Sequence, residues 1–117
     1  MNIEEVRNYC LSKKGTTEDL PFGDAALVFK VLGKMYALAN LEGDLSINLK
    51  CDPEKAISLR EEFEAIKPGY HMNKKHWNTV YPNGPIPDKL IYEWIDESYN
   101  LIVASLPKIK QKEFFED

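Results

Sequence analysis

The chain has 117 residues, of which 44% are hydrophobic, 11% aromatic and 29% charged. This length suits one core, so we expect a single domain over residues 1–117 and exclude an intrinsically disordered chain. The formal net charge of −4 works against non-specific attraction to a polyanion, because phosphate binding depends on clustered Lys and Arg. Any nucleic-acid site must therefore be a local basic patch.

No apolar run approaches the roughly 20 residues that a membrane span needs, and Met1–Glu5 carries acids where a signal peptide needs a basic start. We therefore expect a cytoplasmic protein that has no membrane partner. Cys10 and Cys51 could in principle pair, but nothing else in the sequence indicates a secreted disulfide scaffold. Both cysteines are interpreted as reduced, buried thiols.

The first half of the sequence predicts one helix followed by three strands. Apolar residues at helical spacing extend over about residues 3–13, and Asn2 with Glu5 forms the pattern of a capping box. A turn-rich connector follows at Leu20–Asp24. Three β-like runs separated by short turns then predict an antiparallel meander: Ala26–Val31, Lys34–Leu41 and Leu45–Cys51.

The third run alternates between apolar and polar residues. One face carries Leu45, Ile47 and Leu49, and the other carries Ser46, Asn48 and Lys50. This alternation is typical of a sheet with one wet side, whose polar face is available for a helix, a ligand or a partner. Cys51 continues the apolar parity, so we expect it to face the core, where a thiol is inert.

A strong helix start follows the meander. Asp52 can cap the free N–H groups, Pro53 is tolerated at the first helical position, and Glu54 suits the positive end of the helix dipole. We expect this second helix to run to about Phe63.

The last part of the chain predicts a short strand and a long helix. The strand covers Trp77–Tyr81, and the helix has a buried stripe of apolar residues between Leu90 and Ile102. A loose basic tail is expected over residues 107–117, although Phe114 and Phe115 could dock on the domain.

Five segments carry a resemblance to a known family: Pro21–Asp24, Val28–Val31, Gly33–Met35, Asn48–Glu54 and Pro68–Val80. In their order they resemble the MmcQ/YjbR family over about residues 1–106, and the last segment is too long to be a chance motif. The resemblance implies an α+β fold similar to the CyaY/frataxin type, in which helices pack on one side of an antiparallel sheet.

The resemblance also implies a function. The family is described as DNA-binding with a double-wing motif, in which β-hairpin wings would grip a duplex. The predicted turns Leu32–Gly33 and Glu42–Asp44 are short, which gives such wings little length to enter a groove.

One stretch of the chain carries a sustained charge asymmetry. From Ala65 to Pro87 no acidic residue occurs, whereas three lysines and both histidines of the protein are present. Lysines can neutralise phosphates, and aromatic or amide side chains beside them can stack on bases or read base edges. The candidate nucleic-acid-binding residues are Lys67, Tyr70, His71, Asn73, Lys74, Lys75, His76 and Trp77, together with Lys30, Lys34 and Lys50 on the predicted sheet.

Two other interpretations stay open. Tyr70 and Trp77 could be packing residues among ordinary solvated lysines. Alternatively, a protein-interaction or small-ligand module could use the region of Tyr70, His71 and Trp77 and the polar sheet face of Ser46 and Asn48. A basic patch continuous across loop and sheet would favour DNA, whereas an enclosed pocket with convergent polar groups would favour a ligand.

We expect no catalytic residues, cofactor or metal. His71 and His76 match no zinc-ligand spacing, and no cysteine or carboxylate lies between them. Cys51 beside Asp52 could serve a nucleophile, but its expected burial disfavours this role. The sequence has no phosphate loop, nucleophile elbow or dinucleotide fingerprint.

Four acidic residues on predicted loops could attract cations: Asp19, Asp24, Glu42 and Asp44. They are scattered singly and form no ridge on one helix face. This scatter favours ordinary solvated loop charge. We therefore expect a non-enzymatic DNA-binding protein of this family, with a protein- or ligand-binding module as the alternative.

Overall fold

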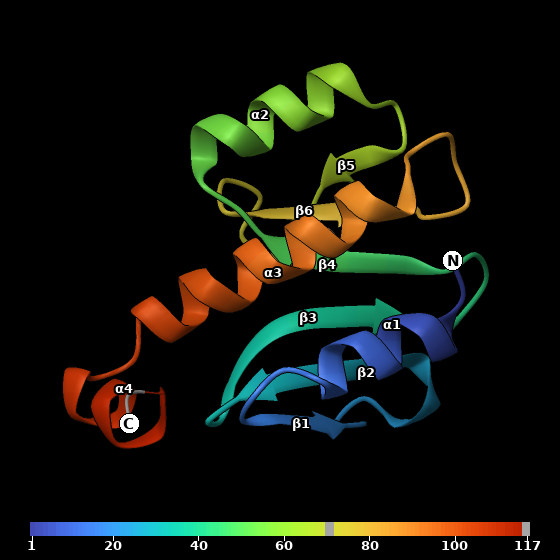
Figure 1. Ribbon diagram of the computed structural model, residues 1–117. Helices are drawn as coiled ribbons and strands as arrows, with labels where there is room; N and C mark the ends of the chain where they lie inside the picture. Colours follow the sequence, from blue (N-terminus) through green and yellow to red (C-terminus); the bar gives the residue numbers. More distant parts are fainter. Residues whose placement is uncertain (70–71, 116–117) are drawn as a thin grey trace.

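The structure is a computed structural model that describes residues 1–69 and 72–115. Its helices are α1 (Ile3–Leu11), α2 (Pro53–Glu62), α3 (Asp88–Ala104) and α4 (Lys108–Phe115), with the short 3₁₀ helix η1 (Gly23–Ala25). Its strands are β1 (Thr16–Asp19), β2 (Ala26–Val31), β3 (Lys34–Asn40), β4 (Ser46–Lys50), β5 (Ile66–Pro68) and β6 (Trp77–Val80). Within the described residues, these form one antiparallel six-stranded sheet in the order β1-β2-β3-β4-β6-β5 (Figure 1).

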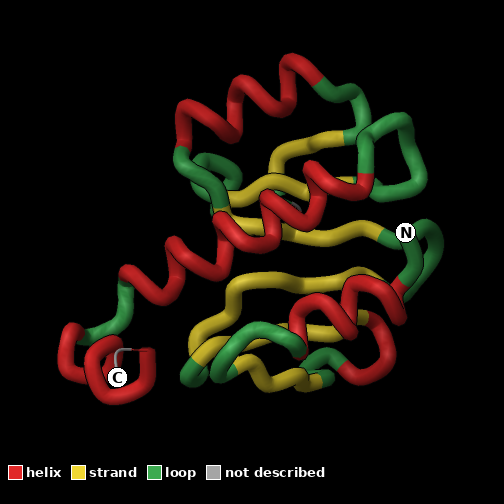
Figure 2. Tube along the Cα trace, viewed as in Figure 1, coloured by secondary structure: helices red, strands yellow, loops and turns green. Residues whose placement is uncertain are grey.

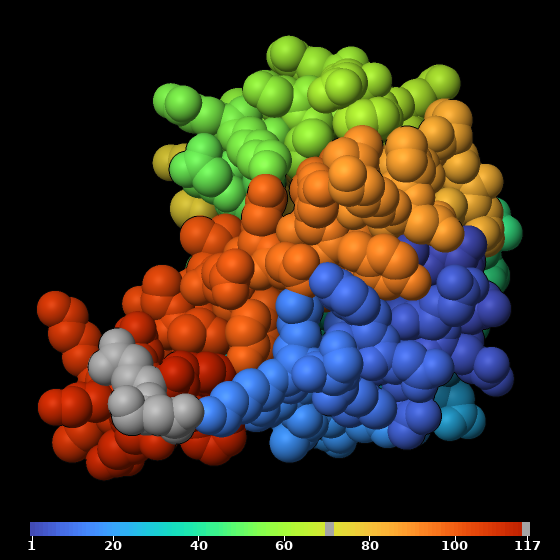
Figure 3. Space-filling model, viewed as in Figure 1, coloured from blue at the N-terminus to red at the C-terminus, as the bar shows by residue number. Residues whose placement is uncertain are grey.

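Helices α1, α2 and α3 lie on one face of the sheet and leave the opposite face free of them (Figures 1 and 2). Helix α3 contacts β2, β3 and β4, whereas α1 contacts β1 and α2 contacts β5 and β6. Figure 3 shows this helix-bearing face, on which α3 runs between α1 and α2. The predicted α+β fold, with helices on one face of an antiparallel sheet, is confirmed.

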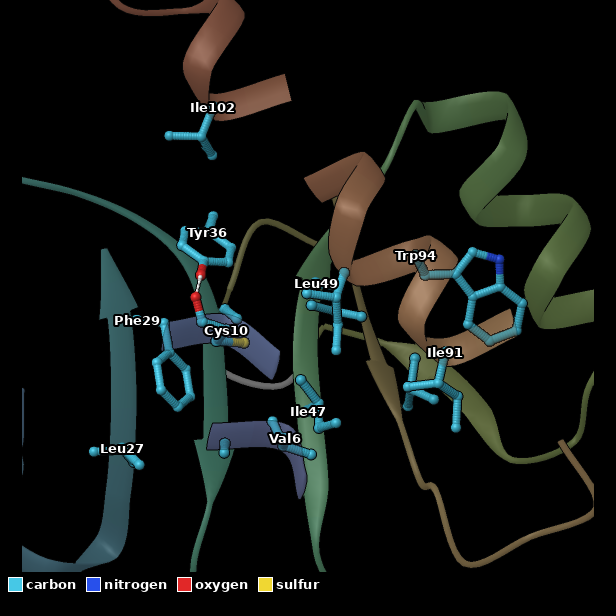
Figure 4. Close-up of a cluster of buried hydrophobic side chains, with 14 of the residues drawn as sticks. Val6, Cys10, Leu27, Phe29, Tyr36, Ile47, Leu49, Ile91, Trp94 and Ile102 are labelled. Carbon is cyan, nitrogen blue, oxygen red and sulfur yellow. Dashed lines mark hydrogen bonds between the residues drawn. The ribbon is translucent and has the colours of Figure 1, made fainter. Parts of the chain in front are cut away.

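The hydrophobic core fills the space between the helices and the sheet (Figure 4). Val6 and Cys10 of α1 and Ile91 of α3 are fully buried against sheet residues such as Phe29 and Ile47. Burial of one such aliphatic or aromatic side chain stabilises the fold by about 1.5–3 kcal/mol. Because successive side chains of a strand point to opposite faces, the neighbours of these core residues point away from the helices.

A bulge lies in the pairing of β2 with β3. Phe29 pairs with Ala37, but the next residue, Lys30, pairs with Met35, so that Tyr36 is an extra residue in β3. Tyr36 and Ala37 are both fully buried on the helix side. The bulge therefore sends Met35 to the face without helices, where strict alternation would have placed Tyr36.

The Ser98 hydroxyl of α3 completes the hydrogen bonding at this bulge. The pairing of β3 with β4 reaches only as far as Ala37 and Leu49. Beyond it, the buried Ser98 Oγ donates to the carbonyl of Tyr36 at 2.6 Å and accepts from the backbone N–H of Lys50 at 2.9 Å. One side chain thus satisfies two backbone groups that the sheet leaves open.

The elements predicted by alternation and capping are confirmed. Strands β2, β3 and β4 agree with the predicted meander to within one residue at each end. Asn2 and Glu5 form the predicted capping box of α1, with Asn2 Oδ1 accepting from the Glu5 N–H at 2.9 Å. Asp52 caps α2 as expected, and this helix ends at Glu62 with Phe63 as its C-cap.

Three elements differ from the predictions. Strands β1 and β5 were not predicted, because both are short edge strands without apolar alternation. The tail expected to be loose is helix α4 over Lys108–Phe115. Its docking aromatic residues agree with the expectation, since Phe115 packs against the core edge-on to Tyr99, with ring centroids 6.4 Å apart.

We predict that Ser98→Ala lowers the free energy of unfolding by about 3 kcal/mol, because it leaves the buried Tyr36 carbonyl and Lys50 N–H without a partner. Urea denaturation followed by tryptophan fluorescence measures this change. The matched control is Ser58→Ala, an exposed position on α2, where we expect a change within about 0.5 kcal/mol. Equal effects of the two substitutions would contradict the role assigned to Ser98.

Candidate ligand groove on the sheet face without helices

A groove with a volume of about 700 Å³ lies on the sheet face that the helices leave free. Strands β2, β3, β4 and β6 form its floor, and the loops beside them form its walls. The lining residues are Phe22, Ala25, Ala26, Met35, Leu38, Asn40, Glu42, Ser46, Asn48, Met72, Thr79 and Tyr81. We call this surface the sheet groove.

The register explains why these residues share a face. Leu38 pairs with Asn48, and Asn48 pairs with Thr79, so the three form one row across β3, β4 and β6. Their neighbours alternate toward the helices, as Leu49 does in the core. From Met35 to Asn40 the sheet groove extends about 17 Å along β3, and the floor strands span about 14 Å across the sheet.

The polar side chains on the groove floor are buried, which differs from the wet face predicted for β4. Asn48 and Ser46 are only 6% and 5% exposed. Phe22 and Met72, from the loops before β2 and β6, line the groove together with these floor residues. Thr79 Oγ1 donates to Asn48 Oδ1 at 2.6 Å, so these two side chains hold each other in place.

Ser46 differs from its neighbours on the floor. Its hydroxyl has no hydrogen-bond partner among the residues that the structure describes, and it faces the sheet groove. Since no fully buried side-chain polar atom among the described residues lacks a partner, the Ser46 oxygen is one that solvent reaches from the groove. Ser46 is therefore the groove residue best placed to bond to a bound molecule.

The rim of the sheet groove comes from residues that were not predicted as site residues. Phe22 and Tyr81 both line the groove, but they are 63% and 39% exposed, in contrast to the buried residues of the floor. Asn40 shapes the turn after β3, since its Nδ2 donates to the Glu42 carbonyl at 2.9 Å. This turn brings Glu42 to the rim.

The loop that carries the predicted basic cluster is a compact hydrogen-bonded turn. The carbonyl of Asn73 accepts from the N–H groups of His76 and Trp77, and its side-chain oxygen accepts from the N–H of Lys75. Arg60 of α2 donates to the Lys74 carbonyl at 3.0 Å and to Asn78 Oδ1 at 2.9 Å. Arg60 was not predicted as a residue of this site, because its position in a helix gives no indication of a contact with a loop 14 residues further along the chain.

The predicted basic residues do not all share one surface. Alternation and register place Lys30, Lys50 and Lys67 at positions on the groove side of the sheet. In contrast, the Lys34 Nζ lies 3.4 Å from the carbonyl and the hydroxyl of Ser105, at the end of α3. Lys30 also lies near an acid, with 3.6 Å between its Nζ and a carboxylate oxygen of Asp19.

Other predicted residues of this loop vary in exposure. Lys74 and Lys75 are exposed, His76 is half-buried and Trp77 is buried, which agrees with a packing role for Trp77. Tyr70 and His71, which were central to the predicted site, lie outside the described residues. The placement of the candidate nucleic-acid surface therefore rests on the lysines.

Both cysteines are buried and free in the structure, as expected. Burial raises the pKa of the Cys51 thiol, and it raises the pKa of the Cys10 thiol to about 12. Thiols with raised pKa values are protonated at neutral pH and are poor nucleophiles. Among residues 1–69 and 72–115, no group of three metal-binding side chains gathers, and no helix is long and apolar enough to cross a membrane.

Comparison with known proteins relates this geometry to a family. The YjbR family model matches residues 11–101. Uncharacterized protein YbdF of Escherichia coli O157:H7 is 47% identical over 79% of this chain and 76% of its own length, and uncharacterized protein YjbR of Escherichia coli K12 is 36% identical over 96% of each chain. The crystal structure of Deinococcus radiodurans protein DR2400 is similar with a TM-score of 0.89 and 40% identity, over 96% of this chain and 86% of that one.

We predict that Arg60→Met frees the turn at residues 73–76, because it removes two hydrogen bonds while keeping the length of the side chain. Amide hydrogen exchange at His76 and Trp77 should accelerate at least about fivefold, since each lost bond contributes about 1 kcal/mol. Arg7→Met is the matched control, because Arg7 bonds to Glu18 on the surface. Unchanged exchange in Arg60→Met would show that Arg60 does not hold this turn.

Proposed function

The chain belongs to the YjbR family, and because the names of its relatives state no activity, we propose from its geometry that it is a non-enzymatic protein that binds a small organic ligand in the sheet groove. One observation carries the proposal. The Ser46 hydroxyl, in a residue only 5% exposed, faces the groove without a partner among the described residues. A ligand that bonds to Ser46 takes the place of water at this solvent-reached hydroxyl.

The size and lining of the sheet groove support this proposal. Pockets for small molecules commonly measure about 300–1,000 Å³ and combine apolar walls with a few polar groups that orient the ligand. Here Ala26, Met35 and Leu38 supply apolar area, and Ser46 with Asn48 supplies polar groups at the floor. The same composition suits a short segment of a partner protein, which is the other occupant that the sequence left open.

The chemistry of the lining favours binding over catalysis. Among the described lining residues, Glu42 and Tyr81 are the titratable ones, and both lie on the rim. Ser46 has no histidine or lysine beside it in that lining to accept its proton, so it lacks the base that a nucleophilic serine needs. We therefore assign Ser46 to ligand recognition.

We predict that small organic compounds perturb the amide NMR signals of the sheet groove. In a screen of neutral fragments, the shifts should group at residues of β3, β4 and β6 that line the groove. Ser46→Ala should weaken the binding of such fragments about fivefold, the equivalent of one hydrogen bond of about 1 kcal/mol. Ser58→Ala on the opposite face should leave their affinity unchanged.

Two results of this screen would contradict the proposal. One is that no fragment perturbs the groove, and the other is that the shifts group on the helix-bearing face. Both results are independent of folding, since the amide spectrum itself reports whether each variant is folded.

DNA binding is the second candidate, and one observation favours it. Lys30, Lys50 and Lys67 occupy positions on the groove side of the sheet, and Lys74 and Lys75 are exposed on the adjoining loop. Such a set could contact a phosphate backbone along one side of the sheet. However, no lysine or arginine is among the described residues that line the groove itself, so the contact would be peripheral.

For DNA, we predict weak binding that depends on salt. Fluorescence anisotropy with random duplex and single-stranded DNA should show a log–log salt slope no steeper than about −3 if three lysines touch phosphate. The double change Lys74→Ala and Lys75→Ala should weaken binding, whereas Lys108→Ala with Lys110→Ala on α4 is the matched control. No binding at low salt would exclude this function.

A further inference from the structure

We infer that the ligand of the sheet groove is an organic cation, an amine or ammonium compound with an apolar body, whose charged group binds at the Glu42 end. The inference rests on the proposed function and adds the chemical class of the ligand. It arises from four features of that end of the groove, taken over the residues that the structure describes: acids without an ion-pair partner, exposed aromatic rings, an unpartnered hydroxyl and a lining without basic residues.

Three acidic residues belong to the two segments that meet at this end. Glu42 lines the groove, and Asp44 follows it in the same turn. The backbone N–H of Leu41 donates to the Ala25 carbonyl at 2.9 Å, and this bond joins the turn to η1, which contains Asp24. None of the three acids has an ion-pair partner among residues 1–69 and 72–115.

Aromatic rings border the same end. The pairing of Ile47 with Val80 sets Tyr81 beside Ser46, and Phe22 lies just before η1 on the other side. An ammonium group over the face of an aromatic ring gains about 0.5–2 kcal/mol, more when water is excluded. Phe22, with 63% of its surface exposed, also gains from any apolar group that covers it.

Ser46 supplies the hydrogen-bond acceptor that an ammonium group requires. It pairs with Asn40 at the end of β3, and the Asn40 side chain bonds to the backbone of Glu42, so one potential partner of the cation lies on β4 and the other in the turn that follows β3. The Ser46 hydroxyl is free to accept, because it has no partner among the described residues. An ammonium N–H can thus reach a carboxylate and a neutral oxygen at one end of the groove.

The remainder of the groove suits an apolar body and excludes two other ligand classes. Leu38 and Met35 continue the floor away from Glu42 and offer apolar contact for a ring or a short chain. An anionic ligand would be repelled by the acidic rim, and the described lining residues include no basic residue that could bind it. A metal ion lacks a set of three close ligands in the same part of the chain.

Three probe molecules that share a phenylethyl body test this inference: 2-phenylethylammonium, 2-phenylethanol and 3-phenylpropionate. Amide NMR titration of the full chain measures the Kd of each at the groove. We expect the cation to bind at least about fivefold more tightly than the alcohol, the equivalent of one partly exposed ion pair with an aromatic contact. The anion should bind more weakly than the alcohol.

Glu42→Gln should bring the affinities of the cation and the alcohol within about twofold of each other. The matched control Glu61→Gln changes an exposed acid on α2, on the opposite face, and should keep the preference. A preference that persists in Glu42→Gln would overturn the assigned position of the charge.

The possible failures are distinguishable. If the alcohol and the cation perturb the groove with equal affinity, the groove binds small molecules but the inference of a cation is wrong. If none of the three probes perturbs the groove, the inference is also overturned, and the screen of neutral fragments then decides on the proposed function separately.

Discussion

The Ser98 hydroxyl and the bulge that it completes determine the geometry of both faces of the sheet. Because Tyr36 is an extra residue in β3, its large side chain enters the core, where its hydroxyl lies 2.9 Å from Thr16 Oγ1 and donates to the Cys10 carbonyl at 3.2 Å. The bulge also sends Met35 to the groove. Without a donor from α3 at this point, the Tyr36 carbonyl would be buried without a partner, and the bulge would be costly.

The two faces of the sheet differ in their contribution to stability. The helix side is a continuous apolar core that includes Val6, Phe29 and Ile95, and it accounts for most of the burial that stabilises the fold. The other side keeps a sheet surface that α1, α2 and α3 leave uncovered, with amide and hydroxyl groups on its floor and aromatic rings on its rim. A surface that adds so little to the core is available for binding.

Charge is also distributed unevenly over the groove side. Glu42 and Asp44 lie in the turn after β3, whereas Lys30 and Lys50 lie toward the opposite ends of their strands. The net charge of −4 adds a weak general attraction for cations. A DNA phosphate backbone along the whole groove would be repelled by Glu42 and Asp44 at one end. DNA could therefore bind only at the other end, near Lys30 and Lys50.

Much of the fold could be predicted from the sequence, because alternation and capping are local signals. The period of two in Leu45–Cys51 indicated β4 and its polar face, and Asp52 indicated the start of α2. Strand β1 carries polar residues on both faces, and β5 ends at Pro68, so neither shows such a period. Their pairing is decided by the neighbouring strands in the folded chain.

The candidate site was predictable only in part. Ser46 and Asn48 followed from alternation, but Phe22 and Glu42 come from loops whose proximity depends on one backbone hydrogen bond between Leu41 and Ala25. The family resemblance, however, contained a signal for the groove. Four of the segments that carry it each contribute a residue to the groove lining: Pro21–Asp24, Gly33–Met35, Asn48–Glu54 and Pro68–Val80.

The central claim is that the sheet face without helices is the functional surface, and the three methionines test it most directly. Met35 and Met72 line the sheet groove, whereas Met1 packs against the core on the other side. With ¹³C-labelled methionine methyl groups, a small-molecule extract of Escherichia coli cells is added and the three NMR signals are followed. We expect the Met35 and Met72 signals to shift while the Met1 signal stays; a shift of Met1 alone, or three unchanged signals, would contradict a functional role for the sheet groove.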